Sequence, residues 1–389
     1  MPNLPGSAVH TYVHWNEAGA SRTARWRSEN GAPPPKRVTV ADDRMTADSA
    51  YRLACEGTAL LWRGDFHNAR QLLQAMGRRV DRPRRRRRPE AEPEAQPRAQ
   101  AFHLHRMAQA QKARTLGMLL VPLDPDHTVP LRRSPDVRQA CLEAYGRPVD
   151  DEPSLVSLRE LLGVIGAHEW RRNGVEVPAL GARIHPHYGV FSPVRGEYVD
   201  LVARAPLPER PSEAFDIGTG TGVLAAVLAH RGVERVVATD GDPRALACAR
   251  ENIERLGLAE RVEVREADLF PPGRARLIVC NPPWIPARAA SSIEQAVYDP
   301  DGRMLHGFLA GLADHLEPGG EGWLVLSDIA EHLGLRSRDE LLTAFAEAGI
   351  DVVDRLDVRP RHAKTRDAED PLHAARAAET TSLWRLAPA

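Results

Sequence analysis

The chain has 389 residues, which is more than a single hydrophobic core usually holds, so we expect two domains. Apolar residues make up 42% of the chain, charged residues 27%, and the net charge is -1, as in an ordinary globular protein. This balance gives no support to extensive non-specific binding of nucleic acid. No apolar run reaches the ~18 residues of a membrane helix, and the N-terminus has no apolar signal core. We therefore expect a cytoplasmic protein with no membrane contact.

Residues 1–44 combine Pro, Gly, Ala and Ser with isolated aromatic residues and show no sustained period. We interpret this stretch as a disordered extension that is dispensable for folding. From Met45 onward an amphipathic pattern of helical period begins. Further helical patterns follow at 101–117, 134–145 and 154–172. The region 45–175 is therefore predicted to be mostly α-helical.

Residues 81–100 interrupt this region with four prolines and the uninterrupted arginine run Arg84–Arg88. Such a composition cannot bury a core, so it predicts a linker or a long exposed loop. The arginines are interpreted either as a phosphate-binding tether or as a solvated charge block, partly offset by the glutamates that follow.

The pattern changes at Gly174, where short apolar runs broken by Pro and Gly replace the helical period. We place the domain boundary here and assign 176–389 to the second domain. Seven short apolar strands alternate with helices along it. This series predicts an α/β fold with a doubly wound, mostly parallel, seven-stranded sheet that binds ligands at the carboxyl ends of its strands.

The first strand of this domain contains Asp216 and leads into the stretch GTGTG at the start of a helix. Glycine lets a backbone pass close to a ligand, and a helix N-terminus offers free amide donors to an anionic group. The same physics serves dinucleotide-binding enzymes, so this loop alone does not identify the ligand. The candidate cofactor-binding residues of the loop are Gly218, Thr219, Gly220 and Gly222.

The next two strands end in carboxylates. Asp240 closes the second strand, where it could accept hydrogen bonds from both hydroxyls of a ribose. The alternative role, a helix N-cap, falls better to Asp242, because Pro243 follows it. After the third strand, Asp268 could accept the adenine amino hydrogens and Leu269 could lie against the ring. Together these residues describe recognition of adenosine.

The fourth strand is followed by Asn281, Pro282, Pro283 and Trp284. Two adjacent prolines remove backbone donors and fix the chain, so that carbonyls can point out of the sheet. The side-chain oxygen of Asn281 and the carbonyl of Pro282 could then accept the two hydrogens of a planar NH2 group. Trp284 could stack on the flat group that carries it. The alternative is a tight turn with a buried Trp.

Four segments resemble, in their order and spacing, the signature of class I S-adenosylmethionine-dependent methyltransferases. They are FDIGTGTG, ATDGDPRAL, EADLF and CNPPW. NPPW resembles the Asn-Pro-Pro-aromatic motif of those that methylate planar nitrogens, although Tyr or Phe is commoner than Trp at the last position. Upstream, GVFSPVRGEYV resembles the lead-in of the small-domain methyltransferase superfamily, which includes release-factor glutamine and rRNA or tRNA amine methyltransferases. The resemblance covers about residues 183 to 389 and implies a Rossmann-like methyltransferase sheet.

The resemblance implies the site. Asp216 and the glycine loop would surround the methionine portion of S-adenosyl-L-methionine, which leaves as S-adenosyl-L-homocysteine. Asp240 would hold the ribose and Asp268 the adenine. The tetrapeptide Asn281–Trp284 would form the acceptor site, with Asn281 as the principal catalytic residue.

Three functions stay open from the sequence. The first is an N-methyltransferase acting on a macromolecule, either a protein glutamine or an exocyclic amine of RNA, with the helical N-terminal region recognising the substrate. The second is a small-molecule N-methyltransferase, and the third is a non-catalytic nucleotide- or RNA-binding protein. Residues 360–380 could be a lid or substrate guide, or a surface loop, and Tyr298–Met304 could border the acceptor site. No metal is expected, because His185 and His187 have no third ligand spaced with them.

Overall fold

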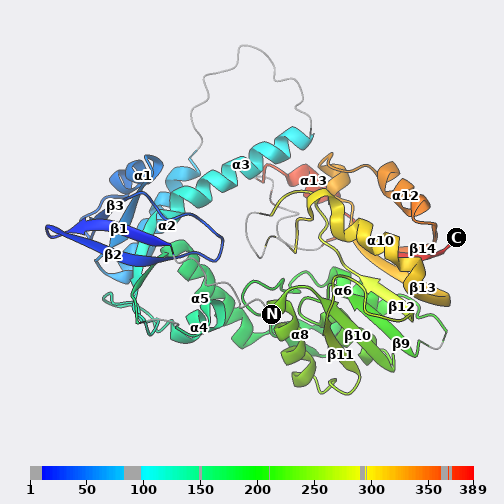
Figure 1. Ribbon diagram of the computed structural model, residues 1–389. Coiled ribbons are helices and arrows are strands. Elements are labelled where there is room, and N and C mark those ends of the chain that lie inside the picture. The colour runs from blue at the N-terminus through cyan, green and yellow to red at the C-terminus, as the bar shows by residue number, and fades with distance from the viewer. Residues whose placement is uncertain are drawn as a thin grey trace, which may run out of the picture. The chain divides into compact units, whose positions relative to one another are not determined.

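The structure is a computed structural model. It describes residues 11–82, 98–148, 151–209, 211–289, 294, 296–360, 367 and 370–389. The chain divides into two compact units (Figure 1): Met1–Glu94 with Arg106–Glu169, and Ala95–His105 with Trp170–Ala389. The run Arg84–Arg88 and most of the predicted linker lie outside the described residues.

The N-terminal unit is built on a six-stranded mixed sheet with strand order β1-β2-β6-β5-β4-β3. Its strands are β1 (Tyr12–Glu17), β2 (Ala20–Arg27), β3 (Arg37–Ala41), β4 (Thr58–Trp62), β5 (Leu119–Leu123) and β6 (Ser154–Ser157). Its helices are α1 (Ala47–Cys55), α2 (Phe66–Val80) and α4 (Arg138–Tyr145), while α3 (Arg98–Gly117) and α5 (Leu158–Asn173) have residues in both units.

The interpretation of 1–44 as a disordered extension is wrong for the strands β1 to β3. Strand β1 alternates buried and exposed residues, with Val13 and Trp15 turned inward. The turn to β2 is Ala18-Gly19, and both residues have positive φ, as in the tight two-residue turns that suit a twisted hairpin. A period of two over six residues is too short to stand out in a Pro- and Ala-rich stretch. Residues 1–10 lie outside the described residues.

Most of the described residues of 45–175 are helical, as predicted, but the region also contains three strands that the sequence did not predict. Strands β4 and β5 are buried along almost their whole length, and β6, the start of the predicted helix 154–172, is a strand. A short, continuous apolar run fits a buried strand and a buried helical turn equally well, so periodicity alone did not separate them. The region is therefore an α/β unit.

The C-terminal unit contains the predicted seven-stranded sheet, with strand order β11-β10-β9-β12-β13-β15-β14. Strand β15 runs antiparallel to both neighbours, and the other pairings are parallel. The strands are β9 (Glu213–Ile217), β10 (Arg235–Asp240), β11 (Val262–Glu266), β12 (Ala275–Cys280), β13 (Leu316–Ser327), β14 (Ile350–Val358) and β15 (Thr381–Pro388). A short hairpin precedes them, with β7 (Val175–Val177), the 3-10 turn η1 (Pro178–Leu180) and β8 (Ala182–Ile184).

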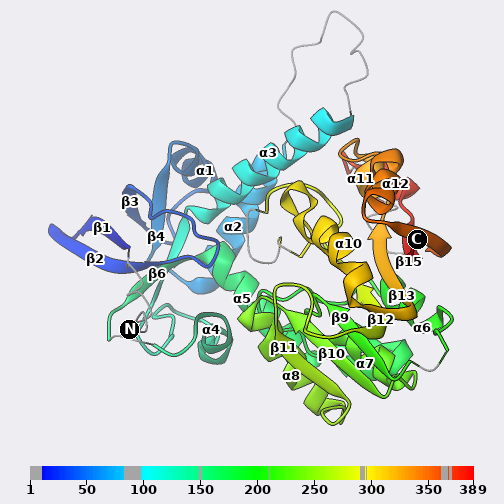
Figure 2. The ribbon, with the colours of Figure 1, turned by 45° about the vertical axis from the view of Figure 1, so that its right-hand side comes forward.

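Helices cover both faces of this sheet because its central strands are apolar on both sides (Figure 2). One core joins the sheet to α6 (Glu197–Arg204), α7 (Val223–His230) and α8 (Pro243–Arg255). The other joins it to α10 (Arg303–His315) and α12 (Arg338–Glu347). The shorter helices are η2 (Pro300–Gly302), α11 (Ile329–His332) and α13 (His373–Ala378). None of the described helices is long and apolar enough to cross a membrane.

Deleting residues 1–44 tests the N-terminal sheet. A chain beginning at Met45 lacks β1 to β3, so β4 and β6 lose their outer neighbours and Leu61, Leu120 and Leu155 lose part of their apolar cover. We expect it to aggregate, or to melt at least ~10 °C lower by circular dichroism. A chain beginning at Thr11, which keeps all three strands, is the control. Equal melting temperatures for all three chains would show that the three strands contribute nothing to folding.

Candidate active site

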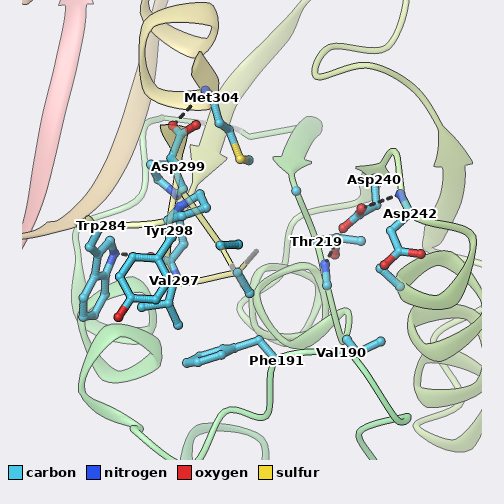
Figure 3. A pocket seen from close by; sticks show the side chains of 18 of the residues that line it. Val190, Phe191, Thr219, Asp240, Asp242, Trp284, Val297, Tyr298, Asp299 and Met304 are labelled. Atoms are coloured by element: carbon cyan, nitrogen blue, oxygen red, sulfur yellow. Dashed lines mark hydrogen bonds between the residues drawn. The ribbon is translucent and has the colours of Figure 1, made fainter. Parts of the chain in front are cut away.

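A cavity of about 970 Å³ opens at the carboxyl ends of β9, β10 and β12 (Figure 3). The glycine loop after β9, the carboxylates after β10 and β11, and the tetrapeptide after β12 all contribute to its lining. In the close view, Thr219, Asp240 and Asp242 lie toward one side, and Trp284 and Tyr298 toward the other. The predicted site residues that line it are Gly218, Thr219, Gly220, Asp240, Asp268, Leu269, Asn281, Pro282, Pro283 and Trp284.

Asp216 does not line this cavity, although the sequence placed it around the cofactor. Its side chain is buried beneath the loop, where one carboxylate oxygen accepts hydrogen bonds from the Thr219 hydroxyl at 2.6 Å and the Ala225 amide at 3.0 Å. Burial raises the pKa of Asp216 to about 6. Through these two hydrogen bonds, Asp216 connects the glycine loop to the first turn of α7.

The loop glycines have different surroundings. Gly218, Gly220 and Gly222 all have positive φ, which other residues rarely adopt. A Cβ on Gly220 would point into open space, whereas one on Gly218 would collide with the side chain of Met304. Gly222 does not line the cavity, and a Cβ there would lie 3.3 Å from Ala249 of α8. Gly222 thus serves close helix packing, and Gly218 and Gly220 face the cavity.

Asp240 is held at the cavity wall by two backbone amides. One carboxylate oxygen accepts from Gly220 at 3.0 Å and the other from Asp242 at 2.9 Å. Asp242 caps α8 by accepting from the Arg244 amide at 2.9 Å, with Pro243 in the first turn, as predicted. Because each oxygen of Asp240 has a second lone pair, the carboxylate can still accept two hydroxyls. Burial raises its pKa.

Asp268 and Leu269 lie at the same end of the cavity. Asp268 is exposed and pairs with Arg303 at 3.1 Å. Leu269 adopts a φ of 73°, and its carbonyl accepts from the Thr239 hydroxyl at 2.6 Å. A positive φ costs a branched residue of order 1 kcal/mol, so local structure must hold this turn in place.

At the other end, the indole N–H of Trp284 donates to the side-chain oxygen of Asn281 at 2.9 Å. The following residue, Ile285, is joined by backbone hydrogen bonds to Val297 and Asp299. This pairing brings Tyr298 beside the tetrapeptide, and Tyr298 to Pro300, Arg303 and Met304 line the cavity. Asp299 is buried and accepts from the Met304 and Leu305 amides at the start of α10. Residues 298–304 thus border the cavity from the tetrapeptide to Asp268, with which Arg303 pairs.

The sequence missed a polar group at this end. Glu379 is buried, lines the cavity, accepts from the Ser327 hydroxyl at 2.8 Å and lies 3.9 Å from Arg195. Burial raises its pKa. Glu379 and Arg376 come from the segment 360–380, of which 361–366, 368 and 369 lie outside the described residues. No local pattern marks a buried Glu in a polar segment, since its burial depends on the strand β13.

His185 and His187, which precede the lead-in segment 189–199, both have structural partners. His185 bonds through its ring to the Arg171 carbonyl, and its backbone amide donates to Asn252. His187 pairs with Glu251 at 2.7 Å. Within the part of the chain that the structure describes, no group of three or more His, Cys, Asp or Glu could hold a metal ion. These contacts fix the lead-in on α8, from where Val190 and Phe191 reach the cavity.

The sheet and its cavity define the class of the domain. Numbered along the chain from β9, the strands lie in the order 3-2-1-4-5-7-6. The dinucleotide-binding order 3-2-1-4-5-6 lacks the antiparallel strand that is inserted here. With the glycine loop after the first strand and Asn-Pro-Pro-Trp after the fourth, the domain has the strand order and loop motifs typical of class I methyltransferases.

The chain is similar to known methyltransferases over part of its length. Residues 181–349 match the family model of the methyltransferase small domain. The chain is 38% identical over 176 residues to the release factor glutamine methyltransferase of Cereibacter sphaeroides (42% of this chain, 62% of that protein). It is 34% identical over 136 residues to the ribosomal protein L11 methyltransferase of Sorangium cellulosum (35% of this chain, 36% of that protein). A crystal structure of ribosomal protein L11 methylase from Lactobacillus delbrueckii subsp. bulgaricus aligns with a TM-score of 0.34 and 18% identity (49% of this chain, 76% of that one).

The segment 181–349 is therefore a methyltransferase small domain. The chain spans less than two thirds of the length of the curated relatives that it matches.

The buried carboxyl of Asp216 predicts a pH dependence of stability. Its folded pKa of about 6 exceeds the unfolded value, so its stabilising contribution is full below about pH 4 and is lost as the pH rises through 6. Relative to Asp216→Asn, the wild-type protein should lose up to ~3 kcal/mol of unfolding free energy between these limits. Urea titrations at pH 4.5 and 7.5 measure this. If the difference in unfolding free energy between the two proteins is the same at both pH values, the raised pKa of Asp216 is contradicted.

Proposed function

We propose that this protein is an S-adenosylmethionine-dependent N-methyltransferase that modifies a planar nitrogen, the favoured acceptor being a glutamine side chain of a protein. One observation carries the proposal. A single cavity joins the glycine loop and Asp240 at one end to the acceptors Asn281 and Pro282 at the other. A cofactor bound at the first end would therefore direct its reactive group toward the second.

The described residues fit this cofactor. Asp240 would accept two ribose hydroxyls with its remaining lone pairs, and Asp268 and Leu269, which line the same cavity, would contact the adenine. Gly220 leaves open space where a side chain would intrude. The carboxylates of the lining also suit a ligand that carries a positive sulfonium. When bound, S-adenosylmethionine supplies an activated methyl group, which leaves S-adenosylhomocysteine behind.

The protein's part is to place the acceptor nitrogen and to stabilise charge on it. Asn281 and the Pro282 carbonyl would accept the two hydrogens of an NH2 group, which orients the nitrogen lone pair toward the methyl carbon. As the new bond forms, positive charge develops on nitrogen, and both acceptors interact more strongly with its hydrogens. The nitrogen becomes more acidic at the same time, so its proton can leave to water without a dedicated base. Trp284 and Tyr298 would cover the flat group and exclude water.

Two observations favour a protein glutamine as the acceptor. The relative in Cereibacter sphaeroides is named a release factor glutamine methyltransferase, and it shares 38% identity over the matched residues. The cavity lining contains four arginines and five acidic residues, with the buried Glu379 at the acceptor end. A polyphosphate chain favours a basic groove, so this mixed charge suits an amide better than RNA.

Cofactor binding is tested by calorimetric titration with S-adenosylmethionine and separately with NAD. We expect micromolar binding of the first and none of the second. Asp240→Ala should weaken the binding of S-adenosylmethionine at least ~10-fold, because two hydrogen bonds to a charged group are lost. Glu254→Ala, which removes an exposed carboxylate on α8 outside the cavity lining, is the matched control. Equal affinity in all three proteins would contradict the role of Asp240, and absence of binding would favour a non-catalytic protein.

Methyl transfer is tested with labelled S-adenosylmethionine and a purified bacterial release factor as the acceptor. Asn281→Ala should lower turnover by ~10²-fold or more, because it removes an acceptor that acts most strongly in the transition state. Cofactor affinity should stay within a few fold. A parallel loss of affinity and turnover would contradict the catalytic assignment. Labelling of RNA or a metabolite fraction in place of the release factor would move the acceptor to that class.

A further inference from the structure

Trp284, the last residue of the acceptor tetrapeptide, forms a hydrogen bond with Asn281, the first. The indole N–H of Trp284 donates to the side-chain oxygen of Asn281 over 2.9 Å, and both residues line the cavity (Figure 3). Phenylalanine at this position would have no donor, and the tyrosine hydroxyl is carried at a different place on its ring. The hydrogen bond is therefore specific to the tryptophan of this chain.

This contact decides which end of the amide faces the substrate. A side-chain amide has a carbonyl oxygen that accepts and an NH2 group that only donates, and a half-turn about its last torsion exchanges them. In the exchanged orientation, the amide NH2 would face the NH2 of the acceptor and repel it. The indole N–H can pair only with the oxygen, so it selects one of the two orientations.

The ring that makes the contact is itself held firmly. Trp284 packs against three apolar clusters, which include the cores on both faces of the sheet. The next residue, Ile285, is paired through its backbone with Val297 and Asp299. A donor fixed in this way keeps its direction before the substrate arrives, which is the condition for a preorganised site.

We propose that Trp284 is a positioning residue that locks the Asn281 amide with its oxygen toward the acceptor nitrogen, and thereby selects acceptors that carry two hydrogens. This inference rests on the proposed function. The indole uses one lone pair of the Asn281 oxygen and leaves the other for the substrate. With the Pro282 carbonyl, the site then offers matching acceptors to the two hydrogens of an NH2 group, whereas a hydroxyl would leave one acceptor unpaired.

A double-mutant cycle tests the proposal. With labelled cofactor and a purified release factor, Trp284→Phe should lower kcat about 5- to 10-fold while changing KM and cofactor affinity less than twofold, because the stacking face stays. In an Asn281→Ala background the same substitution should have almost no further effect, since it acts through Asn281. Trp323→Phe is the matched control: Trp323 also donates its indole hydrogen, at 3.1 Å to Glu321, but does not line the cavity. This control should keep wild-type kcat.

Equal losses from Trp284→Phe in both backgrounds, or no loss in either, would overturn the proposal. A second measurement needs no acceptor. The indole proton of Trp284, identified by its disappearance in Trp284→Phe, should exchange with solvent at least severalfold faster in Asn281→Ala than in the wild-type protein, by NMR. An unchanged exchange rate would also overturn the proposal. Failure of the wild-type protein to methylate the release factor would instead contradict the proposed acceptor, and the exchange rate would still decide whether Trp284 holds Asn281.

Discussion

The site depends on the parallel register of three strands. In the centre of the sheet, Ile217 of β9 lies level with Thr239 of β10 and Cys280 of β12. The next residue of each strand is therefore Gly218, Asp240 or Asn281, and the three leave the sheet at one edge. A slip of one residue would turn every side chain of a strand to the opposite face, and both faces of these strands are buried. The cores that stabilise the sheet thus also fix the relative positions of the residues proposed to bind the cofactor and the acceptor.

Above this edge the chain adopts conformations that cost free energy. Asp216 keeps a carboxyl in the core, and Leu269 holds a positive φ at the cavity wall. Each is tied to a neighbouring segment by a hydrogen bond of 2.6 Å, from the Thr219 hydroxyl to Asp216 and from the Thr239 hydroxyl to Leu269. Local strain and buried charge of this kind persist only where the surroundings over-determine them. Here they shape the two loops that would contact the cofactor, so part of the folding free energy is used to preorganise the site.

The sequence predicted what depends on local pattern. The apolar strands predicted the seven-stranded sheet, and the motifs at their ends predicted that Asp240, Asp268 and Asn281 would share one cavity. It could not predict what depends on tertiary packing. The hairpin at Ala18-Gly19 is visible only once its partner strands are known, and the place of Asp216 beneath the loop follows from the turn into α7. Arg195 and Glu379 are separated by most of the domain in sequence, so only the folded sheet brings their side chains to the same cavity.

At the proposed acceptor end of the cavity, the short motif Asn281–Trp284 determines how many hydrogen-bond donors and acceptors a ligand would meet. Neither Pro282 nor Pro283 has a backbone N–H, so the turn presents carbonyls and withholds main-chain donors. The motif contains one further side-chain donor, the indole N–H of Trp284. It already donates to Asn281 and is therefore not available to a ligand. The proposed substrate would then face more hydrogen-bond acceptors than donors. A ligand with too few hydrogens would bury an unpaired acceptor at a cost of about 1 to 3 kcal/mol, a penalty that shape alone would not impose. At the proposed acceptor site, discrimination between an amide nitrogen and a hydroxyl would therefore depend on the number of hydrogen-bond donors that each acceptor carries, and the aromatic faces of Trp284 and Tyr298 would contribute affinity for the flat group.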